Sequence, residues 1–463
     1  MPDHLECISP VDGRVYVRRE LASGARILAV LKAARTAQAQ WQATPIAERQ
    51  RVLLAGVDAF VADAAAISAE ITWQMGRPLA HTPGEVRGFD ERARHMIAIA
   101  PQALADVAPD PRDGLQRFVR RDPLGVVFVI APWNYPYLTA VNSVVPALMA
   151  GNAVLLKHSA QTPLCAERFA QAFAVAGLPA GLFAALHLDH AAALGLVGDP
   201  RVDFVAFTGS VEGGHAVQRA AADRFIGTGL ELGGKDPAYV RADADLAHAV
   251  DNIMDGVFFN SGQSCCGIER IYVHQGVYDE FVQRAAAFAA GYRLGDPTDP
   301  HINLGPMVRS SAASFVREQI REAVAAGART LVDESGFPAS REGTPYLAPQ
   351  LLVDVHHGMR VMHEETFGPV AGIMKVRDDE EAIRGMNDSR FGLTASVWTR
   401  DREAALAIGQ RVHTGTFFMN RCDYLDPALA WTGIKDSGRG CTLSALGYEQ
   451  LTRPKSYHLR CTI

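Results

Sequence analysis

The chain has few of the features that mark membrane, secreted or nucleic-acid-binding proteins. Its longest apolar run, GVVFVIAPW at 125–133, is far too short to cross a bilayer. The formal charge of -6 is mild for 463 residues and is spread along the chain, so no basic surface for nucleic acid is predicted. The start, MPDHLECISP, lacks the basic and apolar regions of a signal peptide. We therefore expect a cytoplasmic protein that binds neither membrane nor nucleic acid.

Cysteine is also scarce, at seven residues scattered over the chain. An odd, dispersed set does not indicate a disulfide framework, and free thiols in a reducing compartment are expected. Low-complexity tracts, fixed-period repeats and Ser/Gly linkers are absent from the sequence. What remains is an ordinary globular composition, 48% hydrophobic and 21% charged, with a length that favours two or three domains.

The apolar pattern changes from helical to strand-like along the chain. Ala-rich segments with helical spacing occupy 25–41 and 49–76. From residue 125 the pattern becomes GVVFVIA, a β-branched run typical of a strand buried on both faces. AVLLK at 153–157, a helix from about 163 to 176 and VDFVAFTGS at 202–210 follow it. This alternation predicts a mostly parallel, doubly wound sheet.

A second α/β series begins after Asp236. It includes PAYV, RIYVH, a helix at 277–291, VAGIMKV, LTASVWT and GTFFMN. The Gly/Pro-containing stretch LELGGKDP, near 230–236, has the punctuation of a hinge between two domains.

The stretch FFNSGQSCCG contains two adjacent cysteines, Cys265 and Cys266. Neighbouring side chains are not expected to point into one pocket, so at most one of them would be a nucleophile. Small residues and glycines around them keep the backbone open to a substrate. A free cysteine is otherwise commonly an inert buried residue, and this fragment alone leaves both readings open.

Two other residues have both a structural and a catalytic reading. Asn134 lies in PWNYP, where two prolines fix the backbone, so its amide either caps its own turn or points at a developing oxyanion. Glu231 lies between leucines in LELGGK. It is either exposed at a turn or desolvated in a cleft, where a raised pKa would suit a general base.

Two segments are candidates for cofactor binding. Lys157 follows a strand in LLKHSAQTP, at the kind of edge where α/β sheets bind ligands, although a solvated lysine is the commoner case. FTGS at 207–210 joins a strand to a helix and could present backbone N–H groups to a phosphate, or be an ordinary turn. The GxGxxG dinucleotide fingerprint is absent from this stretch.

Together these fragments resemble the aldehyde dehydrogenase superfamily over essentially the whole chain. The resemblance rests on PWNYP, LLKHSAQTP, FTGS, LELGGK, FFNSGQSC, EETFGPV at 364–370 and GIKDSGRG at 433–440, which stand in family order. It implies an α/β fold with a Rossmann-type parallel-sheet cofactor domain, an α/β catalytic domain and a small β oligomerisation element.

The resemblance also implies the domain boundaries. The NAD(P)-binding domain would comprise residues 1–104 and 124–233, and the catalytic domain residues 234–450. Residues 105–123 and 451–463 would form the oligomerisation element, and self-association as a homodimer or homotetramer is expected.

The family's chemistry assigns roles to three residues. Its nucleophile follows Gly-Gln-x, which selects Cys265 over Cys266. The Cys265 thiolate would attack a small-molecule aldehyde to give a thiohemiacetal, whose oxyanion the Asn134 side chain and the Cys265 backbone N–H would hold. After oxidation to a thioester, Glu231 would activate water to release the carboxylic acid. A CoA-acylating relative and a non-catalytic relative that keeps the fold are the alternatives.

The resemblance implies NAD or NADP as cofactor and no metal. The carried-over cofactor-binding residues are Trp133, Lys157, Ser159, Ala160, Gly209, Ser210, Glu365 and Phe367. Many NAD-preferring members have a glutamate where this chain has Ala160. Without that carboxylate nothing repels a 2′-phosphate, and Lys157 and Ser159 could help to hold one, so either cofactor is expected.

The substrate side differs from familiar pockets. The residues at lining positions are Tyr135, Thr139, Asn142, Ser264, Cys266, Tyr424 and Trp431. Their aromatic members suit an apolar or aromatic aldehyde. Arg421 and Arg439 would recognise an acidic group if either faced the tunnel, and otherwise are solvated or contact another subunit. Thr442 replaces a family glutamate that aids proton traffic, so Glu231 is expected to work with water alone.

Overall fold

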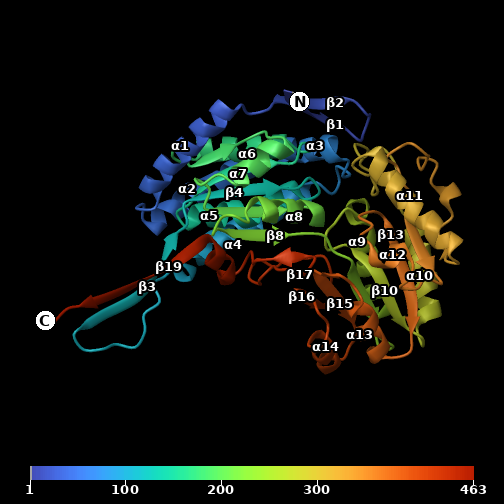
Figure 1. Ribbon diagram of the computed structural model, residues 1–463. Helices are drawn as coiled ribbons and strands as arrows, with labels where there is room; N and C mark the ends of the chain where they lie inside the picture. Colours follow the sequence, from blue (N-terminus) through green and yellow to red (C-terminus); the bar gives the residue numbers. More distant parts are fainter. Residues whose placement is uncertain (1–2, 463) are drawn as a thin grey trace.

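The computed structural model describes residues 3–462, which fold into two α/β bodies and a projecting two-stranded arm (Figure 1). Each body is built on one sheet. The predicted α/β class, with a parallel cofactor-type sheet beside a second α/β unit, is confirmed.

The first sheet has six strands in the order β18-β8-β7-β4-β5-β6. Their bounds are β4 (Val126–Ala131), β5 (Ala153–His158), β6 (Phe183–Ala185), β7 (Phe204–Thr208), β8 (Gly227–Glu231) and β18 (Gly438–Arg439). All neighbours are parallel except β18, which runs antiparallel to β8. β4 and β5 are buried along their whole length, as their β-branched sequences predict.

Helices pack around this sheet and share one apolar core with it. They are α1 (Gly24–Trp41), α2 (Ile46–Ala62), α3 (Ala64–Met75), α4 (Pro83–Ala103), α5 (Pro136–Met149), α6 (Leu164–Val175), α7 (His190–Val197) and α8 (Val211–Ala220). The periodic segment 49–76 is not one helix, because the chain breaks at Asp63 into α2 and α3. Within residues 3–462 no single helix is long and apolar enough to cross a membrane, although α2 and α3 pass that test as a pair bent by 67°.

The second sheet has seven strands in the order β11-β12-β13-β10-β9-β15-β16, parallel except for β11. Their bounds are β9 (Asp236–Val240), β10 (Ile268–His274), β11 (Arg329–Thr330), β12 (Gln350–Val353), β13 (Val370–Val376), β15 (Thr394–Trp398) and β16 (Thr416–Met419). Its helices are α9 (Leu246–Phe258), α10 (Tyr278–Ala290), α11 (Ser310–Ala325), α12 (Arg360–His363), α13 (Asp379–Asn387) and α14 (Arg402–Gly409).

The remaining elements are short pairs and single turns. β3 (Leu115–Pro123) and β19 (Thr452–Arg460) pair antiparallel and form the arm, which extends away from both bodies in Figure 1. β1 (His4–Ile8) pairs with β2 (Val15–Glu20), and β14 (Phe391–Gly392) pairs with β17 (Ile434–Lys435). The 3-10 turns are η1 (Phe259–Gly262), η2 (Glu334–Gly336) and η3 (Ala445–Leu451).

The sequence-based domain division stays a prediction, but the chain's path between the sheets is clear. The segment 232–235 joins the last parallel strand of the first sheet to the first strand of the second. β18 then returns from the later part of the chain to the edge of the first sheet. The two bodies are thus joined at more than one place, next to Glu231.

Candidate active site

Four of the candidate residues lie at one edge of the first sheet. Asn134 follows β4, Lys157 lies at the end of β5, Ser210 follows β7 and Glu231 ends β8. Because these strands are parallel neighbours, their carboxyl ends meet at this edge. The strand order reverses between β4 and β7, and such a switch point is where doubly wound sheets bind ligands.

The segment that carries Cys265 joins α9 to β10 and has an unusual backbone. Asn260, Ser261 and Gly262 are all left-handed, with φ of 55°, 56° and 69°. A Cβ on Gly262 would lie 2.1 Å from a carbonyl oxygen in the EETFGPV segment, and one on Gly234 would lie 2.0 Å from the Cys265 carbonyl oxygen. Three sequence motifs therefore meet around the cysteine, and two glycines permit the contact.

A buried arginine fixes this segment to the Asn134 turn. Arg77 is 1% exposed, pairs with Glu85 at 2.5 Å and donates from Nε to Asn260 Oδ1 at 3.1 Å. Its Nη2 donates to the Asn134 carbonyl oxygen. The Asn134 amide in turn donates to the Gln263 carbonyl oxygen at 3.1 Å. The side chain proposed to hold the oxyanion is thus attached to the chain just before Cys265.

Both adjacent cysteines line one cavity of about 510 Å³, so the expectation that they could not share a pocket is wrong. The turn that follows the left-handed residues brings both side chains to the same wall. They differ in environment, however. Cys266 is 4% exposed and its thiol donates to Asp423 Oδ1 at 2.9 Å. Hydrogen bonding with Cys265, together with burial, raises the pKa of Cys266 well above its usual value.

The same cavity contains every residue placed in the substrate pocket from sequence. Tyr135, Thr139, Asn142, Ser264, Cys266, Tyr424 and Trp431 all line it, with Cys265 and Glu231. At its exposed side the Tyr424 hydroxyl donates to Glu91 at 2.9 Å. Arg421 and Arg439 are exposed and are not among its lining residues. Arg421 lies over the Tyr424 ring instead, 3.6 Å from its centre.

Glu231 is held by two hydroxyl groups. Thr442 Oγ1 donates to Oε1 at 2.7 Å, and Thr208 Oγ1 donates to Oε2 at 3.2 Å. Burial raises the pKa of Glu231, while the two hydrogen bonds and Arg92 act in the opposite direction. Thr442, which replaces the family glutamate, thus contacts Glu231 directly, and the expectation that Glu231 works with water alone stays a prediction.

The EETFGPV segment is positioned by a buried ion pair that the sequence reading missed. Lys235 pairs with Glu269, and Glu269 also accepts from the backbone N–H groups of Thr366 and Phe367. Glu365 comes directly before Thr366 in this segment, and its Oε1 accepts a hydrogen bond from the Gly234 N–H at 2.9 Å. Burial, and next the nearby Glu269 charge, raise the pKa of Glu365 to about 7. The Glu365 carboxylate, which can accept further hydrogen bonds, thus lies where the two sheets meet.

The other predicted cofactor residues lie along the same edge of the first sheet or next to it. Trp133 and Phe367 meet edge to face, with ring centres 5.7 Å apart. Lys157 is 7% exposed and has no ion-pair partner within residues 3–462, and burial lowers its pKa. Asp189 acts on this lysine only from beyond ion-pair distance, so the buried ammonium fits a cofactor ligand better than a solvated side chain.

The remaining cofactor candidates are more exposed. Ser159 is partly buried, Ala160 is exposed, and Gly209 lies at the turn after β7. Ser210 is exposed and its Oγ accepts from the Gly213 N–H at 3.2 Å, which makes it the N-cap of α8. The capping role and the phosphate-binding role are compatible, because the capped helix end directs further N–H groups outward.

Three arginines of the cavity had no recognisable signal in the sequence. Arg77, Arg87 and Arg92 all line it, and all come from α4 or the segment before it. Arg92 is 8% exposed and donates from Nη1 to the Leu138 carbonyl oxygen at 2.7 Å. Among residues 3–462 it makes no ion pair, in contrast to Arg77. Which turn of a long helix faces a cavity is decided by packing that the sequence alone does not display.

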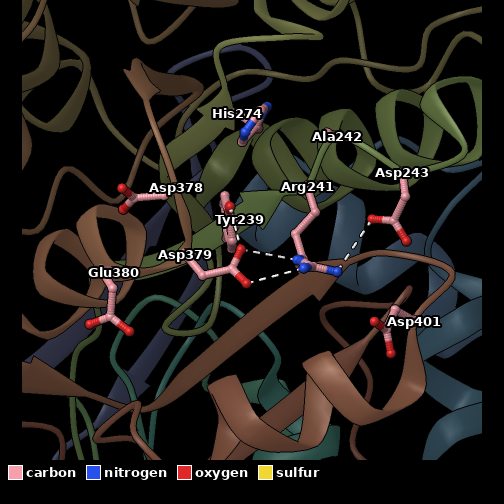
Figure 2. Close-up of a pocket in the computed structure, with 9 residues that line it drawn as sticks. All are labelled: Tyr239, Arg241, Ala242, Asp243, His274, Asp378, Asp379, Glu380 and Asp401. Carbon is pink, nitrogen blue, oxygen red and sulfur yellow. Dashed lines mark hydrogen bonds and ion pairs between the residues drawn. The ribbon is translucent and has the colours of Figure 1, made fainter.

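A second large cavity, of about 640 Å³, lies at the carboxyl ends of β9, β10, β13 and β15 (Figure 2). Most of its charged groups already have partners within the protein. Arg241 bridges to Asp379 at 3.0 and 3.1 Å and to Asp243 at 3.5 Å, as the dashed lines in Figure 2 mark. Asp378 and Asp401 cap α13 and α14. Its wall contains no cysteine, whereas Cys265 and Cys266 both line the cavity of about 510 Å³.

Comparisons with known proteins agree on one family. A sequence model described as the aldehyde dehydrogenase family matches residues 2–457. A relative from Mycobacterium bovis (strain BCG / Pasteur 1173P2), named succinate-semialdehyde dehydrogenase (NADP(+)) 1, is 34% identical over 456 residues, which is 97% of this chain and 98% of the relative. A Paenarthrobacter nicotinovorans aldehyde dehydrogenase is 37% identical over 418 residues, covering 90% of this chain and 91% of the relative.

A solved structure gives the same result. Succinic semialdehyde dehydrogenase from Streptococcus pyogenes, in complex with NADP+, superimposes with a TM-score of 0.94 at 27% identity. The match covers 98% of this chain and 100% of that chain.

Proposed function

The chain belongs to the aldehyde dehydrogenase family and is an NAD(P)-dependent enzyme that oxidises an aldehyde, and on that premise we propose that Cys265 is its nucleophile, Asn134 its oxyanion-binding side chain and Glu231 its general base. The observation that carries the Cys265 and Glu231 assignments is the cavity that both residues line. Asn134 is not among its lining residues and is placed by its hydrogen bond to Gln263, two residues before Cys265. The resemblance inferred from the motifs is confirmed at the level of the family.

The proposed sequence of bonds follows from these positions. Cys265 Sγ, as thiolate, bonds to the aldehyde carbon, and the carbonyl oxygen becomes an oxyanion. The Asn134 amide, whose Nδ2 has one hydrogen bond to Gln263, and the Cys265 N–H stabilise that charge. Bound NAD(P)⁺ would supply the acceptor for the hydride that the thiohemiacetal carbon must lose to become a thioester. Glu231 then takes a proton from water as the water oxygen attacks the thioester, which releases a carboxylic acid and restores the thiolate.

The residues expected to hold the cofactor suit that group. The Glu365 carboxylate can accept hydrogen bonds from ribose hydroxyls, with Trp133 and Phe367 packed beside it. Lys157 and the N-terminus of α8 are the positive groups at the sheet edge. Because Ala160 supplies no carboxylate against a 2′-phosphate, we propose use of NADP as well as NAD.

For the substrate we propose an aldehyde that also carries a carboxylate. Arg92 supports this, because a buried guanidinium with no internal ion pair is costly unless a ligand supplies the counter-charge. Three acids act on the Arg92 charge without pairing with it. Glu85 pairs with Arg77, Glu231 accepts from Thr442 and Thr208, and Glu91 accepts from Tyr424. The names of the Mycobacterium and Streptococcus relatives point to the same class, a semialdehyde. The aromatic walls keep an apolar or aromatic aldehyde as the alternative.

The test compares succinic semialdehyde with butanal, which has the same chain length without the carboxylate, and with an aromatic aldehyde. Succinic semialdehyde, butanal and benzaldehyde are oxidised by the wild type and by Arg92→Gln, with NAD and NADP in parallel. We expect the KM for succinic semialdehyde to rise at least about tenfold in the variant, the size of one hydrogen bond to a charged group, while the KM for butanal hardly changes. Equal changes for both substrates would argue against the carboxylate, and a preference for benzaldehyde would favour the alternative.

Two further variants test the chemistry. Cys265→Ser is expected to abolish oxidation while cofactor still binds. Glu231→Gln is expected to release one NAD(P)H per site and then stall at the thioester. If turnover of the wild type required CoA, the hydrolytic assignment would fail and the acylating alternative would stand.

We also propose that the arm of β3 and β19 joins copies of the chain in a homodimer or homotetramer. Most of β19 is exposed, and an isolated two-stranded ribbon is marginally stable in water. A partner surface along the ribbon would supply the missing neighbour.

A further inference from the structure

A cavity much smaller than the two described above also borders Glu231. Its volume of about 10 Å³ is enough for one water molecule. Glu231 and Thr208 line both this space and the large substrate cavity, whereas Thr442 lines only the small one. Glu231 therefore stands between the two spaces. The water that attacks the thioester is on one side of its carboxylate, and Thr442 is on the other.

The small cavity leads from Glu231 towards solvent. Its polar wall includes Ser143 on α5 and Gln450 in η3, whose Oε1 accepts from the Cys441 N–H at 3.2 Å. Its outer wall includes Arg439 and Gly440, which are both exposed. A water at this place would have polar partners on the inner side and bulk solvent within a short distance.

Thr442 is rigidly placed to bridge the carboxylate and this cavity. Its backbone exchanges two hydrogen bonds with Trp431, at 2.9 and 2.8 Å, which fixes the direction of the side chain. Its hydroxyl lies 2.7 Å from Glu231 Oε1. A hydroxyl both donates and accepts, so it can stabilise the carboxylate by donating to it and can accept a proton from the carboxylic acid.

From this geometry we propose that Thr442 is a positioning residue that holds Glu231 and passes its proton to a single water in the small cavity. The proposal rests on the role of Glu231 as general base. When Glu231 has taken a proton from the attacking water, its O–H donates to Thr442 Oγ1. The proton moves to that oxygen as the threonine's own proton passes to the cavity water. That water releases a proton to solvent near Arg439, and rotation of the hydroxyl restores the starting state.

A threonine differs here from an acidic residue in charge. Of the charged groups around Glu231, Arg92 from α4 acts on its pKa. The other titratable and charged groups that line the two cavities with it are Arg77, His81, Glu85, Arg87, Glu91, Cys265, Cys266, Asp423, Arg439 and Cys441. A carboxylate at position 442 would add a like charge beside Glu231 and favour its protonated form. The neutral hydroxyl stabilises the ionised base without that repulsion.

The first experiment separates this role from a merely structural one. Thr442→Val keeps the shape and removes the hydroxyl, and Thr442→Ser is the matched control that retains it. We expect the valine variant to keep the full burst of NAD(P)H, because acylation does not need the hydroxyl. Its kcat near pH 7 should fall about tenfold, and the acidic limb of kcat should move to higher pH. The serine variant should behave like the wild type.

The second experiment tests the water. Ser143→Val fills the small cavity with methyl groups but leaves both hydrogen bonds to Glu231. We expect a lower kcat with a full burst and an unmoved acidic limb, since only proton release is impaired. This variant also keeps the proposal testable if Thr442→Val does not fold.

The outcomes distinguish failure of the roles given to Thr442 and the water from failure of Glu231 as general base. Wild-type kcat and pH profile in Thr442→Val, with Glu231→Gln stalled, would overturn the threonine's role alone. Wild-type kcat in Ser143→Val would overturn the water. Full turnover in Glu231→Gln would instead remove the general base itself, and the proposed function with it.

Discussion

At the scale of single residues, two neighbouring cysteines have different chemistry because their surroundings differ. Cys265 is partly exposed on the cavity wall, and Cys266 is buried with its thiol donating to Asp423. A thiol that donates to a carboxylate stays protonated, and thiolate is the reactive form. The surroundings of the two cysteines therefore favour Cys265, the same residue that the family motif selects.

This difference predicts which thiol an alkylating reagent modifies. We expect iodoacetamide near pH 8 to label Cys265 at least about tenfold faster than Cys266, because each unit of pKa changes the thiolate fraction tenfold. Peptide mass spectrometry over a time course measures both rates. Cys266→Ser should keep most of the activity, and loss of the activity of that variant together with preferential labelling of Cys266 would reverse the assignment.

Glu365 predicts a pH dependence of cofactor binding. With a pKa of about 7, this carboxyl group is protonated below neutral pH and ionised above it. Only the ionised form accepts from two ribose hydroxyls, so the cofactor Kd should rise as pH falls through 7. Fluorescence titration with NAD at pH 6 and pH 8 measures the change. Glu365→Gln is the control and should give weaker binding that is nearly independent of pH.

At the scale of elements, the sequence predicts what repeats locally and misses what depends on distant contacts. The continuous apolar runs of β4 and β5 were readable because strands buried on both faces show no alternation. The break at Asp63 was not, because no proline or glycine marks it. Arg77 was missed for a similar reason. Its partners come from α4, the Asn134 turn and η1, which meet only in the folded chain.

The buried pair of Arg77 and Glu85 predicts a large effect on stability. Arg77→Met leaves the Glu85 carboxylate buried without its counter-charge, and we expect the free energy of unfolding to fall by about 3–5 kcal/mol. Equilibrium unfolding in urea measures it. The matched control is Arg51→Met, which breaks the exposed pair with Glu48 on α2 and should cause no measurable change. Equal stability of the two variants would show that burial of the first pair is unimportant.

At the scale of the whole molecule, the site exists because two sheets meet. Asn134 and Glu231 come from the carboxyl edge of the first sheet, and Cys265 comes from the segment that precedes β10 in the second. The motifs could be recognised one by one, and the family order placed them together. The contact of Thr442 with Glu231 could not be predicted, because it depends on β18 returning to the first sheet beside β8.

The arm extends away from both bodies, and most of β19 is exposed. Phe118 and Tyr457 stack across it with ring centres 4.5 Å apart, while Leu459 near its tip is 44% exposed. A ribbon of two strands that extends from the body has little apolar surface to bury on its own. Its length and regular pairing over nine residues therefore favour a role between chains.

This predicts the effect of shortening the chain. Removing residues 454–463 deletes most of β19 and should reduce the mass measured by light scattering to that of one chain, because the intersubunit surface is lost. Leu459→Asp, a milder change on the same ribbon, should weaken association so that the mass falls on dilution. Phe225→Ser, at a fully exposed residue outside the arm, is the control and should keep the wild-type mass. A shortened chain that keeps the wild-type mass would place the intersubunit contact elsewhere on the molecule.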